Sequence, residues 1–264
     1  MKYLRKIACL LPVALGLSAS PTVAEDLDPD AMDFAVHDAI FTTFHEIGHM
    51  FVSEFELPVL GKEEDAADAL AALQLLGPDA EEDWGDALIS AADGWYFNAV
   101  KSTGNGVEDL SYYDDHSLDI QRAYAMVCMM VGADPEWFSE VGDSYEMDED
   151  RREACAGVYE QAATSWAAML EPYLADGTTG EKITVVYDKT RKYDAFRKEL
   201  QARNVFEGIA QRIDTTYVLP RPITLRVTEC DEANAYFYAE DGEITYCYEL
   251  SRAMYDMYIN DIPD

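Results

Sequence analysis

Two histidines and a glutamate in the segment Phe44–Met50 have the residue types and the spacing of a metal site. The segment reads Phe-His-Glu-Ile-Gly-His-Met, so His45 and His49 stand four residues apart. On an α-helix this spacing puts both imidazoles on one face, where they can reach a single ion. Glu46 lies beside the pair, where a carboxylate can accept a proton from metal-bound water. The pattern predicts a zinc-dependent hydrolase with Glu46 as its general base.

Two histidines need a further ligand, because a catalytic zinc ion usually has three protein ligands and one open position. Glu63, Glu64 and Asp65 compete for this role at the start of the next helical segment. Glu64 alone has another acid four residues later, Asp68, on the same helical face. A ligating histidine usually donates its second N–H to such a carboxylate. We therefore expect Glu64 as the third ligand and Asp68 as the carboxylate that orients a histidine.

The elements that must position these residues are two consecutive helices. Apolar residues recur at helical spacing over residues 32–55, with Asp30 as the expected N-cap. A second helix is predicted from Gly61 to about Gly77. His37 lies two turns before His45, and we expect it to be an ordinary packed or exposed helix residue.

The motif His-Glu-x-x-His, followed by Glu-x-x-Ala-Asp, resembles that of the gluzincin zinc peptidases, including the HtpX-like and CAAX prenyl-protease group. The longer run FHEIGHMFVSEFELPVLGKEEDAADAL is similar to a family of exported bacterial metallopeptidases, and this similarity covers nearly the whole mature chain. The resemblance implies a bound Zn²⁺ with His45, His49 and Glu64 as ligands. It also implies Glu46 as the base and Asp68 as the supporting acid.

His116 lies in a polar, aromatic loop over residues 111–117, before a helix predicted over residues 118–131 that Ser117 could cap. Many gluzincins hold a histidine or tyrosine over the zinc ion to stabilise the oxyanion, a valuable preorganised donor. His116 is therefore a candidate catalytic residue, and the alternative is a surface or capping histidine. Tyr112 and Tyr113 are further candidates for the same role.

The first 24 residues have the pattern of a secretory signal peptide. Lys2, Arg5 and Lys6 precede an apolar run over residues 7–17, and cleavage is expected after Ala24. The run is too short to span a membrane, and no later segment is apolar for long enough. The sequence thus predicts an exported protein, periplasmic or secreted, without membrane insertion after signal removal.

Acidic residues dominate the composition and restrict the partners. The formal net charge of −33 becomes −36 once the three cations of the signal are removed. Such a surface repels nucleic acids and anionic lipids, so both are excluded as partners. A peptide or protein substrate is expected, while the oligomeric state stays open.

Four cysteines remain after cleavage, and an even number in an exported protein suggests two disulfides. Three pairings are possible. Proximity in the sequence favours Cys128 with Cys155 and Cys230 with Cys247. A metal site is the rival role, but there is no close Cys-x-x-Cys pair.

The chain changes character after about residue 176. Residues 25–176 are predicted to be a helical metal-binding subdomain, with later helices over 81–102 and 149–174. Residues 177–264 are predicted to be β-rich, with strands at 183–187, 223–229, 234–238 and 244–248, helices over 191–200 and 205–213, and a helical tail over 250–259. The fold class is therefore α+β and zincin-like, the two parts forming one catalytic unit.

The segment Asn234–Cys247 resembles the Asn-Ala-Phe strand and hairpin of HtpX-like peptidases. In those enzymes this hairpin precedes the metal helix, whereas here it follows, so the order of the parts is permuted. We expect the C-terminal sheet to fold back over the helix of His45 and His49. An edge strand beside the cleft could then bind a peptide by β-augmentation; the alternative is a sheet without substrate contact.

The leading hypothesis is a zinc metallopeptidase that hydrolyses peptide bonds. A second hypothesis is a non-catalytic exported zinc-binding protein derived from a peptidase fold. A third treats the His-Glu-x-x-His segment as a helix face without metal. An open fourth position on the metal would distinguish the first from the second.

Overall fold

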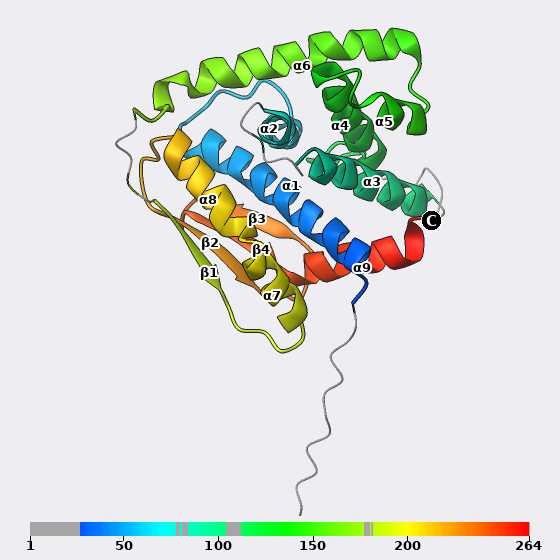
Figure 1. Cartoon of the computed structure of the whole chain (residues 1–264). Helices are drawn as coiled ribbons and strands as arrows, with labels where there is room; N and C mark the ends of the chain where they lie inside the picture. The colour runs from blue at the N-terminus through cyan, green and yellow to red at the C-terminus, as the bar shows by residue number, and fades with distance from the viewer. Residues whose placement is uncertain are drawn as a thin grey trace, which may run out of the picture.

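The long helix α1 (Pro29–Glu54) runs through the middle of the molecule in the computed structural model, which describes residues 27–77, 80, 84–103, 112–176, 180 and 182–263 (Figure 1). Asp28 caps this helix, because its side chain accepts hydrogen bonds from the backbone N–H groups of Asp30 and Ala31. Pro29 occupies the first helical position, where a missing N–H is tolerated. The expected cap at Asp30 is therefore wrong, since Asp30 lies inside the first turn.

Five further helices and one short 3₁₀ turn complete the described helical part. They are α2 (Glu63–Leu76), α3 (Trp84–Thr103), α4 (Asp119–Ala133), α5 (Ser139–Ser144), α6 (Glu149–Leu170) and the turn η2 (Glu171–Tyr173). The long α6 lies along one side of this part, over α2 and α4 (Figure 1). The cap expected at Ser117 is wrong, because Leu118 occupies the N-cap position of α4. The helix expected to reach residue 174 ends at Leu170 and continues only as η2.

The C-terminal part is a small mixed sheet with three helices. In chain order it contains β1 (Ile183–Tyr187), α7 (Asp194–Ala202), α8 (Val205–Thr216), β2 (Ile223–Thr228), β3 (Ala235–Tyr238), β4 (Glu243–Cys247) and α9 (Tyr248–Asp261). The strand order is β1-β2-β4-β3. Strands β1, β2 and β4 are parallel, and β3 pairs antiparallel with β4 through a hairpin that turns at Asp241-Gly242. Strand β3 is thus an edge of the sheet.

Helix α1 contacts both parts of the chain. It packs against α2 and α3 on one side and against β3, β4, α8 and α9 on the other (Figure 1). Phe44, Ile47 and Phe51 are completely buried between these elements. The fold class α+β is confirmed, and the sheet does lie against α1 as expected. The zincin-like assignment and the division at residue 176 stay predictions.

Both disulfides have the pairing expected from the sequence. Cys128 of α4 is bonded to Cys155 of α6, and Cys230 is bonded to Cys247 at the end of β4. Disulfides of this kind are compatible with an exported protein. Among the described residues, no helix has the length and apolar character needed to cross a membrane. The predicted signal peptide, the start of the helix expected at residue 81 and the loop position 111 lie outside the described residues.

Candidate metal centre

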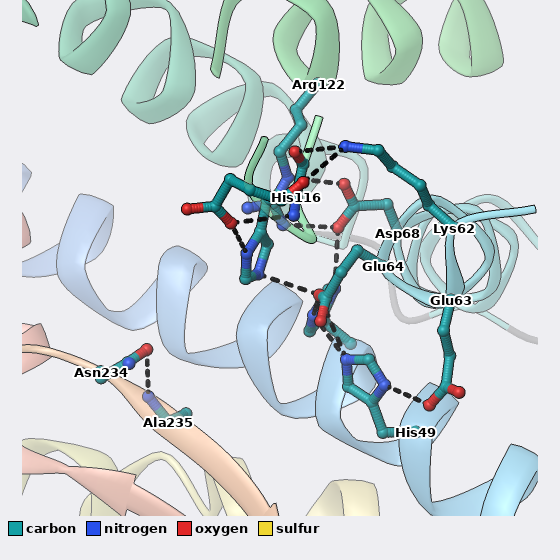
Figure 2. Close-up of polar contacts among 11 residues, drawn as sticks. His49, Lys62, Glu63, Glu64, Asp68, His116, Arg122, Asn234 and Ala235 are labelled. Atoms are coloured by element: carbon teal, nitrogen blue, oxygen red, sulfur yellow. Dashed lines mark hydrogen bonds and ion pairs between the residues drawn. The ribbon is translucent and has the colours of Figure 1, made fainter. Parts of the chain in front are cut away.

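Three side chains of α1 and α2 converge on one point. The Nε2 atoms of His45 and His49 lie 3.1 Å apart, and Glu64 Oε2 lies 3.1 Å from the first and 3.3 Å from the second (Figure 2). Both histidines come from adjacent turns of α1, and Glu64 comes from the first turn of α2. Because α2 packs directly on α1, residues 15 or more positions apart in sequence meet here.

Carboxylates hold the opposite nitrogen of each imidazole. His45 Nδ1 lies 2.7 Å from Asp68 Oδ1, and His49 Nδ1 lies 2.8 Å from Glu63 Oε1. A carboxylate only accepts hydrogen bonds, so both Nδ1 atoms donate. In the neutral form of each ring, the lone pair of Nε2 would point toward Glu64, and three acceptors would face one another. Such a set needs a cation among its members.

This donor set fits a zinc ion. Three atoms bound tetrahedrally to zinc at about 2.0–2.2 Å lie about 3.3–3.6 Å from one another. The three separations observed here are 3.1, 3.1 and 3.3 Å. Two imidazole nitrogens and one carboxylate oxygen are also ligands that zinc accepts in catalytic sites. His45, His49 and Glu64 could hold such an ion with little movement.

The electrostatics of the three groups indicate a strong affinity for positive charge. Burial opposes protonation of His45, but its hydrogen bonds with Asp68 and Glu64 outweigh burial and raise its pKa to about 9. Burial likewise opposes ionisation of Glu64, yet the hydrogen bonds with His116, His45 and His49 hold its pKa well below the ordinary value. Protons compensate the negative charge in the absence of metal, and metal binding would release them.

Arg122 of α4 supports the outer side of the centre. Its guanidinium donates two hydrogen bonds of 2.7 Å to Asp68, and it stacks 3.6 Å over the ring of Trp95. Burial would raise the pKa of Asp68, but the His45 hydrogen bond and Arg122 lower it to about 2. Trp95, Arg122, Asp68 and His45 thus form a continuous chain of contacts to the centre.

Glu46 is buried beside the histidines, with 7% of its surface exposed. Burial raises the pKa of its carboxyl group, while the neighbouring His45 and His49 oppose this effect. Among the described residues, no hydrogen bond to its carboxylate is present, so the group is available to a reactant. A raised pKa close to a cation site is suited to accepting and returning a proton.

His116 reaches the centre from the loop before α4. Its Nε2 lies 2.9 Å from Glu64 Oε2, and its Nδ1 lies 3.2 Å from Asp114 Oδ1 (Figure 2). The ligand-type atoms of His45, Glu64 and His116 lie within 4.8 Å of one another. Hydrogen bonding to Glu64 raises the pKa of His116, although burial partly opposes it.

Gly48 allows the two helices to approach closely enough for these contacts. A Cβ atom at this position would lie 2.8 Å from the Cα atom and 2.9 Å from the Cβ atom of Ala67. Real Cβ atoms do not approach so closely, so any larger residue would move α2 away from α1. The glycine between the two histidines therefore permits the close approach of α2, the helix that carries Asp68.

Sequence reasoning named His45, Glu46, His49, Glu64, Asp68 and His116, and the structure brings all six together. It missed Glu63, which was considered only as a rival of Glu64, and it missed Arg122. The available signal for Arg122 was a single cation within the apolar helix α4. His37 lies elsewhere, with its Nδ1 2.9 Å from Ser90 Oγ. Tyr112 and Tyr113 are largely exposed.

An α+β fold in which imidazole and carboxylate atoms converge defines this chain as a candidate metal-binding protein. A family model matches residues 17–170 and 187–262, and this family, DUF4344, carries the description "Putative metallopeptidase". The chain belongs to this family, because the match covers most of its length. No curated protein and no solved structure matches the chain.

Proposed function

We propose that this protein is a zinc-dependent metallopeptidase that hydrolyses peptide bonds. The observation that carries the proposal is the convergence of His45 Nε2, His49 Nε2 and Glu64 Oε2 within 3.3 Å, with both Nδ1 atoms fixed by carboxylates. Membership of a metallopeptidase family supports it independently.

Each residue of the centre then has a distinct task. A divalent ion held by His45, His49 and Glu64 would supply Lewis-acid chemistry, polarising a carbonyl and lowering the pKa of water toward about 7. Glu46 accepts the proton of the attacking water and returns it to the leaving amine. Asp68 and Glu63 keep the two imidazoles in the tautomer that offers Nε2 to the ion. His116, when it is not itself bound to the ion, would donate a hydrogen bond to the developing oxyanion.

Strand β3 offers a binding edge for an extended peptide. It is one of the two edge strands of the sheet, and it contacts α1. An edge strand has unpaired N–H and C=O groups, and a peptide can pair with them by β-augmentation. We propose a peptide or protein substrate outside the cytoplasm, in keeping with the predicted signal peptide and the disulfides.

Glu46→Gln tests the catalytic assignment directly. The variant keeps the three ligand residues and should bind zinc like the wild type. Loss of the general base should reduce turnover of a fluorogenic peptide library by about 10²–10⁴-fold. Glu160→Gln, on an exposed part of α6, is the matched control and should change neither quantity. Unchanged hydrolysis in Glu46→Gln would contradict the role of this residue.

One observation favours the alternative, a non-catalytic exported zinc-binding protein. His116 Nε2 lies 2.9 Å from Glu64 Oε2, where it could fill the position that a catalytic ion keeps open. A wild-type protein that binds zinc through His45, His49 and Glu64 yet hydrolyses nothing in the library would favour this alternative over the peptidase.

A further inference from the structure

His116 differs from the other members of the centre in how it is supported. His45 is 6% exposed and stands on the rigid α1, whereas the side chain of His116 is 46% exposed and stands on a loop. None of residues 112–118, which we call the strap, is buried. Segments with few buried apolar contacts open at low free-energy cost. The strap can therefore move while the helices stay in place.

Lys62 holds the strap against α2. Its Nζ donates hydrogen bonds to the backbone carbonyl oxygens of Asp114 (3.0 Å) and His116 (2.6 Å), as Figure 2 shows. Asp114 in turn accepts from the backbone N–H and contacts the ring of His116. Lys62, Glu63 and Glu64 are consecutive, so neighbouring residues fasten the strap, orient His49 and supply the carboxylate of the centre.

His116 meets the point of convergence at Glu64, 2.9 Å from its Nε2, but it lies farther from His45 than His49 does, with ring centroids 6.5 Å against 4.8 Å apart. The three helix-borne atoms lie within 3.3 Å of one another, whereas the set that includes His116 extends to 4.8 Å. Tetrahedral ligands lie about 3.3–3.6 Å apart, so a small movement of the strap would complete a four-ligand site.

We propose that the strap makes His116 a displaceable fourth ligand of the metal, latched by Lys62. With the strap closed, an imidazole would fill the position that water or a substrate carbonyl needs, so turnover of the wild type would be limited to the fraction of molecules with an open strap. With the strap open, three protein ligands remain and the position is accessible. The inference rests on the proposed metal site of His45, His49 and Glu64, and it adds regulation of that same site.

The test uses the full mature protein loaded with Co²⁺, whose visible absorption reports the ligand set, and Zn²⁺ X-ray absorption to count imidazoles. We expect three imidazoles in the wild type and two in His116→Ala. Loss of a residue that hydrogen-bonds a metal ligand typically lowers metal affinity by about 10–100-fold, and loss of a ligand in His116→Ala should lower it by at least as much. The probe acetohydroxamate should bind the variant more tightly, because no imidazole has to leave.

Lys62→Met provides a second variant that keeps every proposed ligand. Loss of two hydrogen bonds from a charged group should favour the open strap and tighten acetohydroxamate binding by about tenfold, with the metal affinity nearly unchanged. Lys101→Met is the control, since this lysine pairs with Asp261. The proposal that His116 is a displaceable ligand would be overturned by two imidazoles on the metal of the wild type. It would also be overturned by equal acetohydroxamate affinity in the wild type and the three variants. Failure of the proposed site itself is distinguishable, because Glu64→Gln would then leave metal binding intact.

Discussion

The face of α1 that carries His45 and His49 also carries Asp38, and the two ends of this face differ in how buried charge is paired. Asp38 lies seven residues, or nearly two helical turns, before His45. At the histidine end, carboxylates hold the outer nitrogen of each ring, and Asp68 itself is held by Arg122. At the other end, Asp38 Oδ2 is buried without a hydrogen-bond partner among the described residues.

The difference shows two ways of placing a carboxyl group in a protein interior. Asp68 keeps its charge, because His45 and Arg122 hold its pKa at about 2 in spite of burial. Asp38 is readily protonated, because burial raises its pKa to about 7 and the contacts with Thr42 and Arg122 compensate only in part. An ionised carboxylate therefore supports the metal centre, and a carboxyl that readily holds a proton lies two turns away.

Arg122→Met should have the largest effect, because it turns Asp68 into a second poorly paired carboxyl. Removing one partner of a buried ion pair typically costs about 3–5 kcal/mol. We expect a loss of this size in urea unfolding of the metal-free protein, together with weaker zinc binding because His45 loses its fixed support. The matched control is Arg252→Met, which removes a partly exposed pair with Asp256 and a contact with Tyr255. Its cost should stay below about 1 kcal/mol, and equal costs would contradict the comparison.

Asp38→Asn should remove one source of the pH dependence of stability, separate from the one that the raised pKa of His45 gives the metal end. In the wild type, the pKa of the Asp38 carboxyl is about 7 in the folded chain and 3.8 ordinarily. Between pH 3.8 and about 7, the folded protein therefore keeps a proton that the unfolded chain has released. Stability must therefore fall as the pH rises through this window. The free energy of unfolding of the variant should exceed that of the wild type by up to about 4 kcal/mol near pH 8, and by little near pH 4.

Urea unfolding at the two pH values measures this difference. Asp30→Asn, an exposed carboxyl in the first turn of the same helix, should show no comparable gain at the higher pH. Tyr246 lies near Asp38 on the sheet side, and burial raises the pKa of its hydroxyl well above the window. A stability gain in Asp38→Asn that is independent of pH would show that the carboxyl is ionised throughout.

Much of the fold could be predicted because single elements follow local periodicity. The helix of residues 32–55 and all four strands were found to within a few residues, since their apolar spacing is regular. The short helix α5 was missed, because six residues hold too few periods. The parallel pairing of β1, β2 and β4 was also beyond reach, since it depends on crossovers and not on the sequence of any one strand.

The residues of the candidate site also divide into those that a local pattern predicts and those that only long-range contacts reveal. His45, Glu46 and His49 were found through a spacing within one helix, and Glu64 and Asp68 through a spacing within the next. Arg122 was not found, because its partner Asp68 is 54 residues away and no local pattern connects them. Glu63 stood in a run of acids where composition could not separate one carboxylate from another. Contacts between elements far apart in sequence need the three-dimensional structure.

Gly48→Ala should give the smallest effect and shows whether the metal end depends on close helix packing. The added methyl group would lie 2.8 Å from the Cα atom and 2.9 Å from the Cβ atom of Ala67. Overpacking of this kind typically lowers the free energy of unfolding by about 1–3 kcal/mol. Zinc affinity should fall as well, because Glu64 and Asp68 move away with α2. Gly157→Ala in α6 is the same substitution with nothing within 4 Å, and it should stabilise the protein by about 0.5–1 kcal/mol. Equal stability changes in the two variants, or unchanged zinc affinity in Gly48→Ala, would show that the approach of α2 does not position these carboxylates.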